Sequence, residues 1–214
     1  RCNLCLTRGN VSMAKHNWQQ HTTSKLRIIG GKHGGRSIQY SGDKRTRPMK
    51  ERVREAMFNL VGSAVKDTHV IDLFAGTGAI GLEAISRGAS SLLMIERHFP
   101  TARIINDNIR EIGEEDVCEI VTSDTFFWFN HRFAKGLVQL PNRPWSVFCS
   151  PPYDLFIDME SEIQALITSL MELAPKGSMF CLESDQRFEV DRVFPDFTWQ
   201  TREYPPAVLH VSHL

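Results

Sequence analysis

Apolar and polar stretches alternate along residues 68–214 in a way that predicts strands and helices in turn. Short apolar runs suit buried strands, and longer segments with apolar residues every three or four positions suit helices. The predicted strands are 69–74, 91–96, 117–122, 145–149, 178–183, 197–203 and 207–213, and the predicted helices are 79–86, 101–112, 124–133 and 157–173. The alternation favours an α/β fold with a Rossmann-like, doubly wound, mostly parallel sheet, whose last two strands form an antiparallel pair at one edge.

The first third of the chain has a different pattern. A short strand over 26–29 runs into a pair of glycines, and 36–40 is its expected hairpin partner. Apolar residues share one face of a helix predicted over 49–61, with Pro48 at its start. We therefore expect a flexible extension over 1–24, a basic hairpin-and-helix arm over 25–66 and an α/β domain over 67–214.

Composition is that of an ordinary globular protein, but charge divides the chain. The 214 residues are 42% hydrophobic and 23% charged, as expected for one domain with a small appendage. The sequence has no run of about 18 apolar residues, no N-terminal signal pattern and no cysteine framework, so we expect a cytoplasmic protein without a membrane span. We also expect it to be a monomer. Residues 1–54 hold 13 Lys and Arg against 2 Asp and Glu, whereas residues 55–214 hold 12 against 23. The basic part is either an arm that binds a polyanion or a solvated tail.

A glycine-rich loop follows the first strand of the α/β domain. Gly76, Gly78 and Gly81 form a complete G-x-G-x-x-G between a predicted strand and a predicted helix, which is typical of nucleotide-binding turns. Glycines let the backbone approach a ligand and let the helix pack closely on the strand. Glu96 ends the next strand, where a carboxylate can bind two ribose hydroxyls. The alternative is a tight turn without a ligand.

Asp72, just before this loop, discriminates between nucleotide cofactors. Its carboxylate would repel the pyrophosphate of a dinucleotide, which argues against a nicotinamide-dependent dehydrogenase. It suits S-adenosylmethionine, which carries a sulfonium and an ammonium. Asp124 is expected to bind the adenine amino group or to cap a helix, and His98 or Phe99 to cover an adenine face, with core packing as the alternative for Phe99. The predicted cofactor-binding residues are Asp72, Phe74, Gly76, Gly78, Glu96, Arg97, Asp124 and Thr125.

The strand over 145–149 ends in the tetrapeptide Ser150-Pro151-Pro152-Tyr153. Two prolines give a rigid turn with free carbonyls, and the tyrosine offers a flat face on which a base can stack. Double-proline loops are common, so the tetrapeptide gains its meaning from the glycine loop and the acidic residues before it. Because ligand sites of doubly wound sheets form at the carboxyl ends of strands, we predict catalytic roles for all four residues.

These motifs together resemble class I methyltransferases that modify exocyclic amino groups of bases. The segments 27–31, 35–36, 47–48 and 51–59 look like those of the RsmD-like family of bacterial 16S ribosomal RNA guanine-N2 methyltransferases, and the resemblance runs from Lys25 to the C-terminus. It implies that 67–214 is a methyltransferase domain that uses S-adenosylmethionine, with ribosomal RNA or the small ribosomal subunit as partner and the N2 amino group of a guanine as target. The alternatives are an amino methyltransferase acting on DNA adenine or another RNA, and a catalytically weak pseudo-methyltransferase that binds ribosomal RNA.

Ser150 departs from that family, which usually has aspartate at this position. An exocyclic amine is a poor nucleophile because its lone pair is delocalised into the ring. Two acceptors on its hydrogens would free the lone pair and align it, and we expect the side chain at 150 and the Pro151 carbonyl to be these acceptors. A carboxylate makes a charge-assisted bond about twice as strong as a neutral one, so serine is expected to keep the geometry and slow the reaction.

A target base inside folded RNA must be turned out of its stack, which requires contacts with phosphates. The predicted RNA-binding residues are Arg27, Arg36, Lys44, Arg45, Arg47 and Arg54, each with a solvated surface charge as the alternative. The resemblance suggests that Arg47, Pro48 and Arg54 also close over the cofactor.

No metal site is expected. Cys2, Cys5, His16 and His21 have a spacing near that of a zinc finger, but the middle gap is short and apolar residues are few, which favours a tail without metal. The sequence lacks Gly-x-Ser-x-Gly, so a hydrolase is not expected either.

Overall fold

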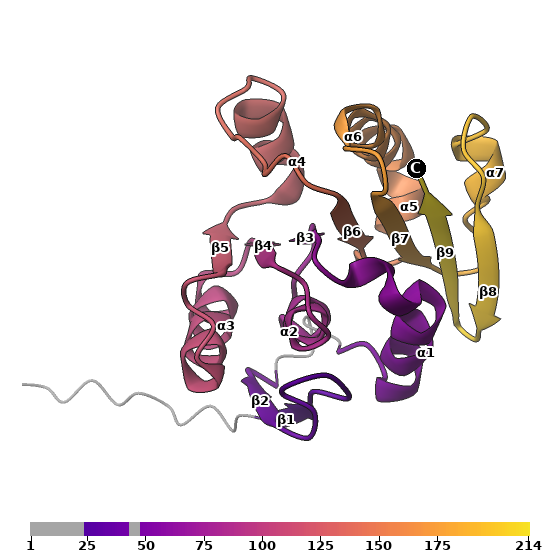
Figure 1. Cartoon of the computed structure of the whole chain (residues 1–214). Helices are drawn as coiled ribbons and strands as arrows, with labels where there is room; N and C mark the ends of the chain where they lie inside the picture. Colours follow the sequence, from indigo (N-terminus) through magenta and orange to yellow (C-terminus); the bar gives the residue numbers. More distant parts are fainter. Residues whose placement is uncertain (1–23, 43–47) are drawn as a thin grey trace, which may run out of the picture.

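The computed structural model describes residues 24–42 and 48–214. Within these ranges a seven-stranded sheet has the order β5-β4-β3-β6-β7-β9-β8, and β1 pairs with β2 in a separate hairpin (Figure 1). β3 to β7 run parallel, and β9 is antiparallel to both β7 and β8, which confirms the predicted fold and the edge pair. The strands of the large sheet are β3 (His69–Asp72), β4 (Ser91–Glu96), β5 (Cys118–Thr122), β6 (Trp145–Cys149), β7 (Met179–Ser184), β8 (Gln200–Tyr204) and β9 (Ala207–His213).

Helices cover both faces of this sheet. On one face lie α1 (Glu51–Val61), α2 (Ala79–Ser86) and α3 (Phe99–Ile112), together with the hairpin of β1 (Ser24–Arg27) and β2 (Ser37–Tyr40). On the other lie α4 (Thr125–Trp128), α5 (Leu155–Asp158), α6 (Glu160–Leu173) and α7 (Val190–Val193). Single turns η1 (Gly62–Val65) and η2 (Phe129–Phe133) follow α1 and α4. Among these described helices, none is long and apolar enough to cross a membrane.

An apolar core lies on each face of the large sheet, which explains why its central strands are nearly continuous hydrophobic runs in the sequence. Successive side chains of a strand point to opposite faces, so strands covered on both sides must be apolar at every position. Val70 and Phe148 pack beneath α1 and α2, whereas their neighbours Ile71 and Val147 pack against α6 on the other face. The hairpin joins the first core, because Ile38 is buried there with residues of α1 and α2.

Two predicted helices differ from the structure. The segment 124–133 is α-helical only over Thr125–Trp128 and then widens into the π-type turn η2. The segment 157–173 belongs to two helices that are separated at Met159, whose φ of −131° and ψ of 37° leave the helical region. The break escaped prediction because apolar residues on both sides of it face the same core. The short helix α7 was not predicted.

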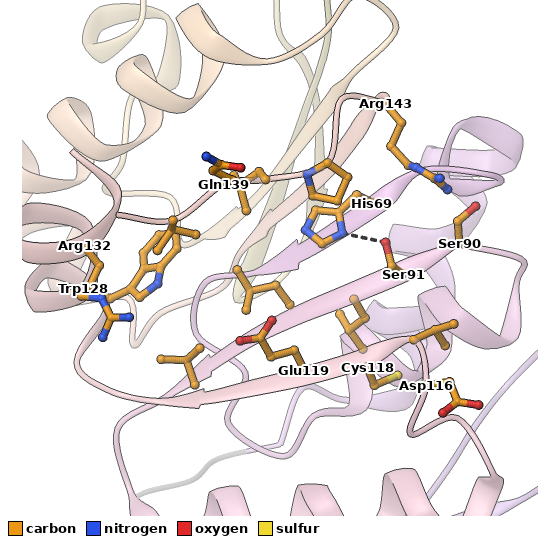
Figure 2. Close-up of a pocket in the computed structure, with 17 residues that line it drawn as sticks. His69, Ser90, Ser91, Asp116, Cys118, Glu119, Trp128, Arg132, Gln139 and Arg143 are labelled. Carbon is orange, nitrogen blue, oxygen red and sulfur yellow. Dashed lines mark hydrogen bonds between the residues drawn. The ribbon is translucent and has the colours of Figure 1, made fainter. Parts of the chain in front are cut away.

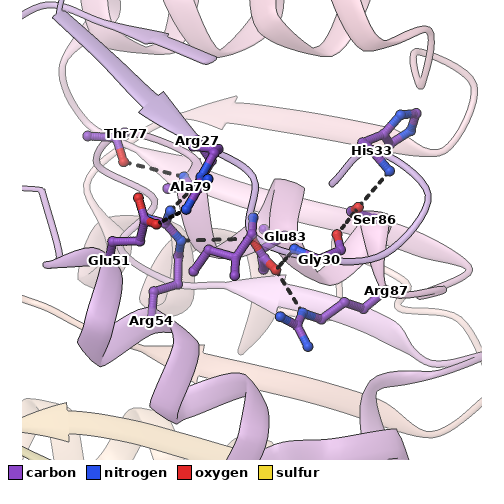
Figure 3. Close-up of polar contacts among 12 residues, drawn as sticks. Arg27, Gly30, His33, Glu51, Arg54, Thr77, Ala79, Glu83, Ser86 and Arg87 are labelled. Carbon is purple, nitrogen blue, oxygen red and sulfur yellow. Dashed lines mark hydrogen bonds and ion pairs between the residues drawn. The ribbon is translucent and has the colours of Figure 1, made fainter. Parts of the chain in front are cut away.

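Glu83 of α2 fastens the hairpin to the sheet domain (Figure 3). Its fully buried carboxylate accepts hydrogen bonds from the Ile29 amide at 2.7 Å, the Gly30 amide at 2.9 Å and Arg87 Nε at 2.7 Å. Arg54 of α1, also buried, places its Nε 3.9 Å from the same carboxylate. The hairpin, α1 and α2 are thus tied together through one acidic side chain.

Gly31 is required where the hairpin loop meets the end of α2. Its φ is +77°, and a Cβ there would lie 1.8 Å from the Ser86 carbonyl oxygen. The Lys32 amide donates to that same carbonyl at 2.7 Å, and the Ser86 hydroxyl donates to the Gly30 carbonyl at 2.5 Å. The glycine pair that the sequence marks as a turn is therefore also a docking point.

Candidate active site

The predicted site residues follow neighbouring strands at one edge of the sheet. The chain proceeds outward from β3 to β4 and β5 and then returns to β6 on the other side of β3, which is the topological switch point where such sheets bind ligands. Hydrogen bonds join the loops there: the Leu73 amide donates to the Phe148 carbonyl at 3.0 Å, and the Ala75 amide to the Ile95 carbonyl at 3.0 Å. The structure thus brings the glycine loop between the strand end that carries Glu96 and the one that carries the tetrapeptide.

Glu96 braces the glycine loop. Its carboxylate accepts hydrogen bonds from the Gly76 amide at 2.9 Å and from the His98 amide at 2.7 Å. Each carboxylate oxygen of Glu96 keeps a further lone pair, so Glu96 can hold the loop and still accept a hydrogen bond from a ribose hydroxyl.

Gly81 lies where α2 crosses β4, and a Cβ there would come within 2.9 Å of the Leu92 side chain. The third glycine of the motif therefore lets the helix pack closely on the strand.

Asp72 is a buried carboxylate without a cationic partner in the described part of the chain. One oxygen accepts from the Gly81 amide at 3.2 Å, and Oδ1 makes no hydrogen bond of ordinary geometry. Burial raises the pKa of Asp72 to about 7 and the charge of Glu96 adds to the rise, against the opposing effect of the Gly81 and Phe74 amides. A ligand with positive charge would supply the missing partner, so these residues fit S-adenosylmethionine better than a pyrophosphate.

Of the remaining residues predicted to bind cofactor, two have tasks within the protein. Asp124 caps α4, accepting at 3.0 Å from both the Phe126 and the Phe127 amide, so the capping alternative is realised. A bond from its other oxygen to adenine stays a prediction. Thr125 is buried, and its hydroxyl donates to the Leu73 carbonyl at 2.5 Å, so its side chain is not directed at a ligand.

Arg97 and Phe74 of the predicted set, and Phe99, which was expected to cover an adenine face, flank the loops. Arg97 is exposed next to Glu96, and Phe74 is half-buried, with its ring 6.0 Å from that of Phe126. Phe99 is 62% exposed, so it does not pack in the core. Its ring remains available to cover an adenine.

The tetrapeptide is organised by a residue that sequence reasoning missed. The Ser150 hydroxyl donates a short hydrogen bond to Glu183 Oε2, and the Tyr153 hydroxyl donates to Oε1 at 2.7 Å. Glu183 is 6% exposed and belongs to β7. The turn itself is closed by the Leu155 amide, which donates to the Pro152 carbonyl at 2.9 Å. Within residues 24–42 and 48–214, no backbone amide donates to the Pro151 carbonyl.

Strand register could have found Glu183. Cys149 of β6 pairs with Leu182 of β7, so Ser150 lies beside Glu183 on the next position of the neighbouring strand. The predicted strand 178–183 ends in this glutamate, and parallel strands present their carboxyl ends at one edge. Burial raises the pKa of Glu183, an effect that the hydrogen bonds from Ser150 and Tyr153 oppose.

The predicted RNA-binding residues divide into three groups. Arg27 and Arg36 are exposed, although Arg27 pairs with Glu51 at 2.5 Å and Arg36 donates to the Glu111 carbonyl at 3.0 Å. Arg54 is 1% exposed and donates to the Arg27 carbonyl at 2.5 Å, so its predicted contact with RNA phosphate is corrected. Outside the described residues lie Lys44, Arg45, Arg47, the extension over 1–23 and the cysteine–histidine pattern within it.

A hollow of about 530 Å³ lies away from this site (Figure 2). Residues of β3, β4 and β5 line it together with the segment 138–143, and none of the predicted site residues does. His69 lies in its wall, with Nδ1 2.8 Å from the Ser91 hydroxyl. Burial lowers the pKa of His69 to about 4, with Arg143 adding to the effect, so this imidazole is neutral at physiological pH.

The strand order, the glycine loop and the acidic strand ends define a class I methyltransferase fold. A sequence model of the family described as conserved hypothetical protein 95 matches residues 26–206, and the chain belongs to this RsmD-like family. A candidate rRNA methyltransferase of Bacillus subtilis, YlbH, is 25% identical over 180 residues, covering 83% of this chain and 92% of the relative.

Two further comparisons bear on the site. The ribosomal RNA small subunit methyltransferase D of Buchnera aphidicola, strain APS, is 33% identical over 131 residues, which cover 61% of this chain and 64% of that relative. Among solved structures, an RNA methyltransferase from Salinibacter ruber in complex with S-adenosyl-L-homocysteine superposes with a TM-score of 0.55 at 20% identity. That superposition covers 77% of this chain and 92% of the other.

Proposed function

We propose that the protein transfers a methyl group from S-adenosylmethionine to ribosomal RNA of the small subunit, at the N2 amino group of a guanine. The observation that carries the proposal is the juxtaposition of the tetrapeptide with the glycine loop at the switch point, in a chain of the RsmD-like family. The relative from Buchnera, named a small-subunit ribosomal RNA methyltransferase, supports the substrate class, and the Salinibacter complex supports the cofactor.

The residues present suit this cofactor. Asp72 offers a buried carboxylate to a cation, Glu96 offers acceptors to ribose hydroxyls, and Asp124 keeps an oxygen for the adenine amino group. When bound, S-adenosylmethionine supplies a methyl group on a sulfonium, which is already a good leaving group. The protein's share of catalysis is therefore to position the amine and to place charge.

The target base is assigned to the tetrapeptide. Tyr153 offers its ring face for stacking, and the Pro151 carbonyl and the Ser150 hydroxyl oxygen are the acceptors for the two amine hydrogens. The exposed Arg27 and Arg36 lie on the arm and suit contacts with phosphate.

The test is transfer of labelled methyl from S-adenosylmethionine to three substrates: small ribosomal subunits lacking the modification, free ribosomal RNA, and duplex DNA. Digestion to nucleosides identifies the product. Label in N2-methylguanosine from ribosomal RNA is the expected result. Label in N6-methyladenine from DNA would support the alternative amino methyltransferase, and cofactor and RNA binding without transfer to any substrate would support a binding protein.

A further inference from the structure

We propose that Glu183 is a positioning residue for methyl transfer, whose carboxylate orients the Ser150 hydroxyl and takes up, through it, the proton that the target amine releases. The inference rests on the proposed function and deepens it. The Glu183 carboxylate comes from the neighbouring strand β7, and the Ser150 hydroxyl lies between it and the proposed position of the amine.

The Glu183 carboxylate is directed at the tetrapeptide. Both of its oxygens face the tetrapeptide, one toward the Ser150 hydroxyl and one toward the Tyr153 hydroxyl. Because the Ser150 proton points to Glu183, the Ser150 oxygen presents its lone pairs elsewhere, as an acceptor for the amine requires. Tyr153, which we assign to base stacking, is held by the same carboxylate, so one side chain fixes both contacts with the base.

The carboxylate is also uncompensated. Glu183 is buried, and in the described part of the chain it makes no ion pair with Lys, Arg or His. The titratable groups that face it are Tyr153 on the tetrapeptide and Cys181 on its own strand. Its partner on β9 is the apolar Leu209, and Arg52 of α1 donates instead to the Pro205 carbonyl. A carboxylate that is buried without a cation accepts a proton more readily than an exposed one.

Atoms and charge balance along this route. The N–CH₃ bond forms as the S–CH₃ bond breaks, the electron pair of the broken bond stays on sulfur, and the nitrogen is left with a positive charge. The Ser150 oxygen then accepts a proton from that nitrogen while the Ser150 proton moves to Glu183 Oε2. The products are a neutral methylated amine, a neutral thioether and a protonated Glu183, which later loses its proton to solvent.

The first experiment compares Glu183→Gln with wild type on small ribosomal subunits. Glutamine keeps the volume and one acceptor oxygen but cannot take the proton, so we expect the turnover number to fall by about 100-fold, within the range of general acid–base effects. The KM for RNA and the Kd for S-adenosylmethionine are expected to change by less than about threefold, because the variant leaves the residues assigned to the cofactor and the exposed arginines of the arm unchanged. Glu172→Gln, an exposed change of the same kind on α6, is the matched control and should retain wild-type turnover.

A second variant separates this role from a merely structural one. In Ser150→Asp with Glu183→Gln, the carboxylate is returned to the site in direct reach of the amine. Turnover should recover to within about tenfold of wild type, since a charge-assisted acceptor is again present. If the double variant is as slow as Glu183→Gln alone, or if Glu183→Gln turns over at the wild-type rate, the inference is wrong.

A readout without turnover tests the contact itself. The pKa of the Glu183 carboxyl is measured by ¹³C NMR in wild type, Ser150→Ala and Tyr153→Phe. Because each hydroxyl stabilises the charged form, the pKa should rise in both variants. An unchanged pKa in both would overturn the arrangement even if methyl transfer is observed. If wild type methylates no ribosomal RNA, the proposed function fails on its own, whatever this titration shows.

Discussion

Two buried glutamates of the same sheet domain have opposite surroundings. Glu83, on α2, is surrounded by amides and two guanidinium groups, and it fastens the hairpin arm to the core. Among the residues that the structure describes, the side chain of Glu183, on β7, accepts hydrogen bonds from two hydroxyls of the tetrapeptide and from no cation. A buried charge that is paired serves structure, because its removal strands its partners. A buried carboxylate without a cationic partner can accept a proton during a reaction. The position of Glu183 beside the tetrapeptide suits it to the proton that the target amine releases.

The largest effect should follow from breaking the structural glutamate. Glu83→Gln leaves Arg54 buried without a carboxylate, and loss of one member of a buried pair costs about 3–5 kcal/mol. We expect the free energy of unfolding to fall by about that amount in urea titrations. Glu183→Gln, measured in the same way, should change it by about 1 kcal/mol or less because no buried cation is stranded. Equal losses in the two variants would remove the distinction.

Substitutions of Ser150 test the role of Glu183 in the reaction itself. Ser150→Ala removes the acceptor and the hydroxyl that links it to Glu183, so turnover should fall by about 10- to 100-fold with cofactor affinity unchanged. Ser150→Asp should keep or raise turnover, because a carboxylate acceptor binds the amine more strongly. Single-turnover rates on small ribosomal subunits measure both. A Ser150→Asp protein that binds cofactor and RNA normally yet transfers nothing would refute this role of Ser150.

Asp72 is another buried carboxylate, and its raised pKa predicts a pH dependence of cofactor binding. Its raised pKa of about 7 means that it gains charge only as the pH rises through that value. A cationic cofactor binds the charged form better, so affinity for S-adenosylmethionine should rise between pH 6 and 8, by at most about tenfold per pH unit, and then level off. Calorimetry on wild type and Asp72→Asn provides the check, since the variant should lack this rise. Identical pH profiles would show that Asp72 does not face the cation.

The smallest effects are expected on the arm. Arg36→Gln removes one exposed guanidinium, so RNA affinity should weaken a few-fold and the slope of log K against log salt should fall by about one. Lys176→Gln, an exposed change after α6, serves as the control for a loss of charge elsewhere. Filter binding of the target RNA over a range of salt concentrations gives both slopes. If the two slopes are equal, the exposed arm does not contact RNA at Arg36.

Sequence periodicity predicted the strands, because buried strands are short apolar runs, and their alternation with helices predicted a mostly parallel sheet with an antiparallel pair at one edge. It also placed Glu96 and the glycine loop, since G-x-G-x-x-G acts through local backbone geometry. It misjudged Arg54 because charge and position alone do not reveal that Glu83, 29 residues away, draws that guanidinium into the core. Glu183 was missed for a similar reason: its contact with Ser150 depends on the register between two strands, which no single segment encodes.

In the proposed function, cofactor and base meet at the switch point between β3 and β6. A crystal structure with S-adenosylhomocysteine tests it most directly. We expect density over the glycine loop, with the ribose at Glu96, the ammonium end toward Asp72 and the sulfur facing Ser150. Density in the hollow beside His69 and Arg143, or none over the glycine loop at saturating ligand, would contradict it.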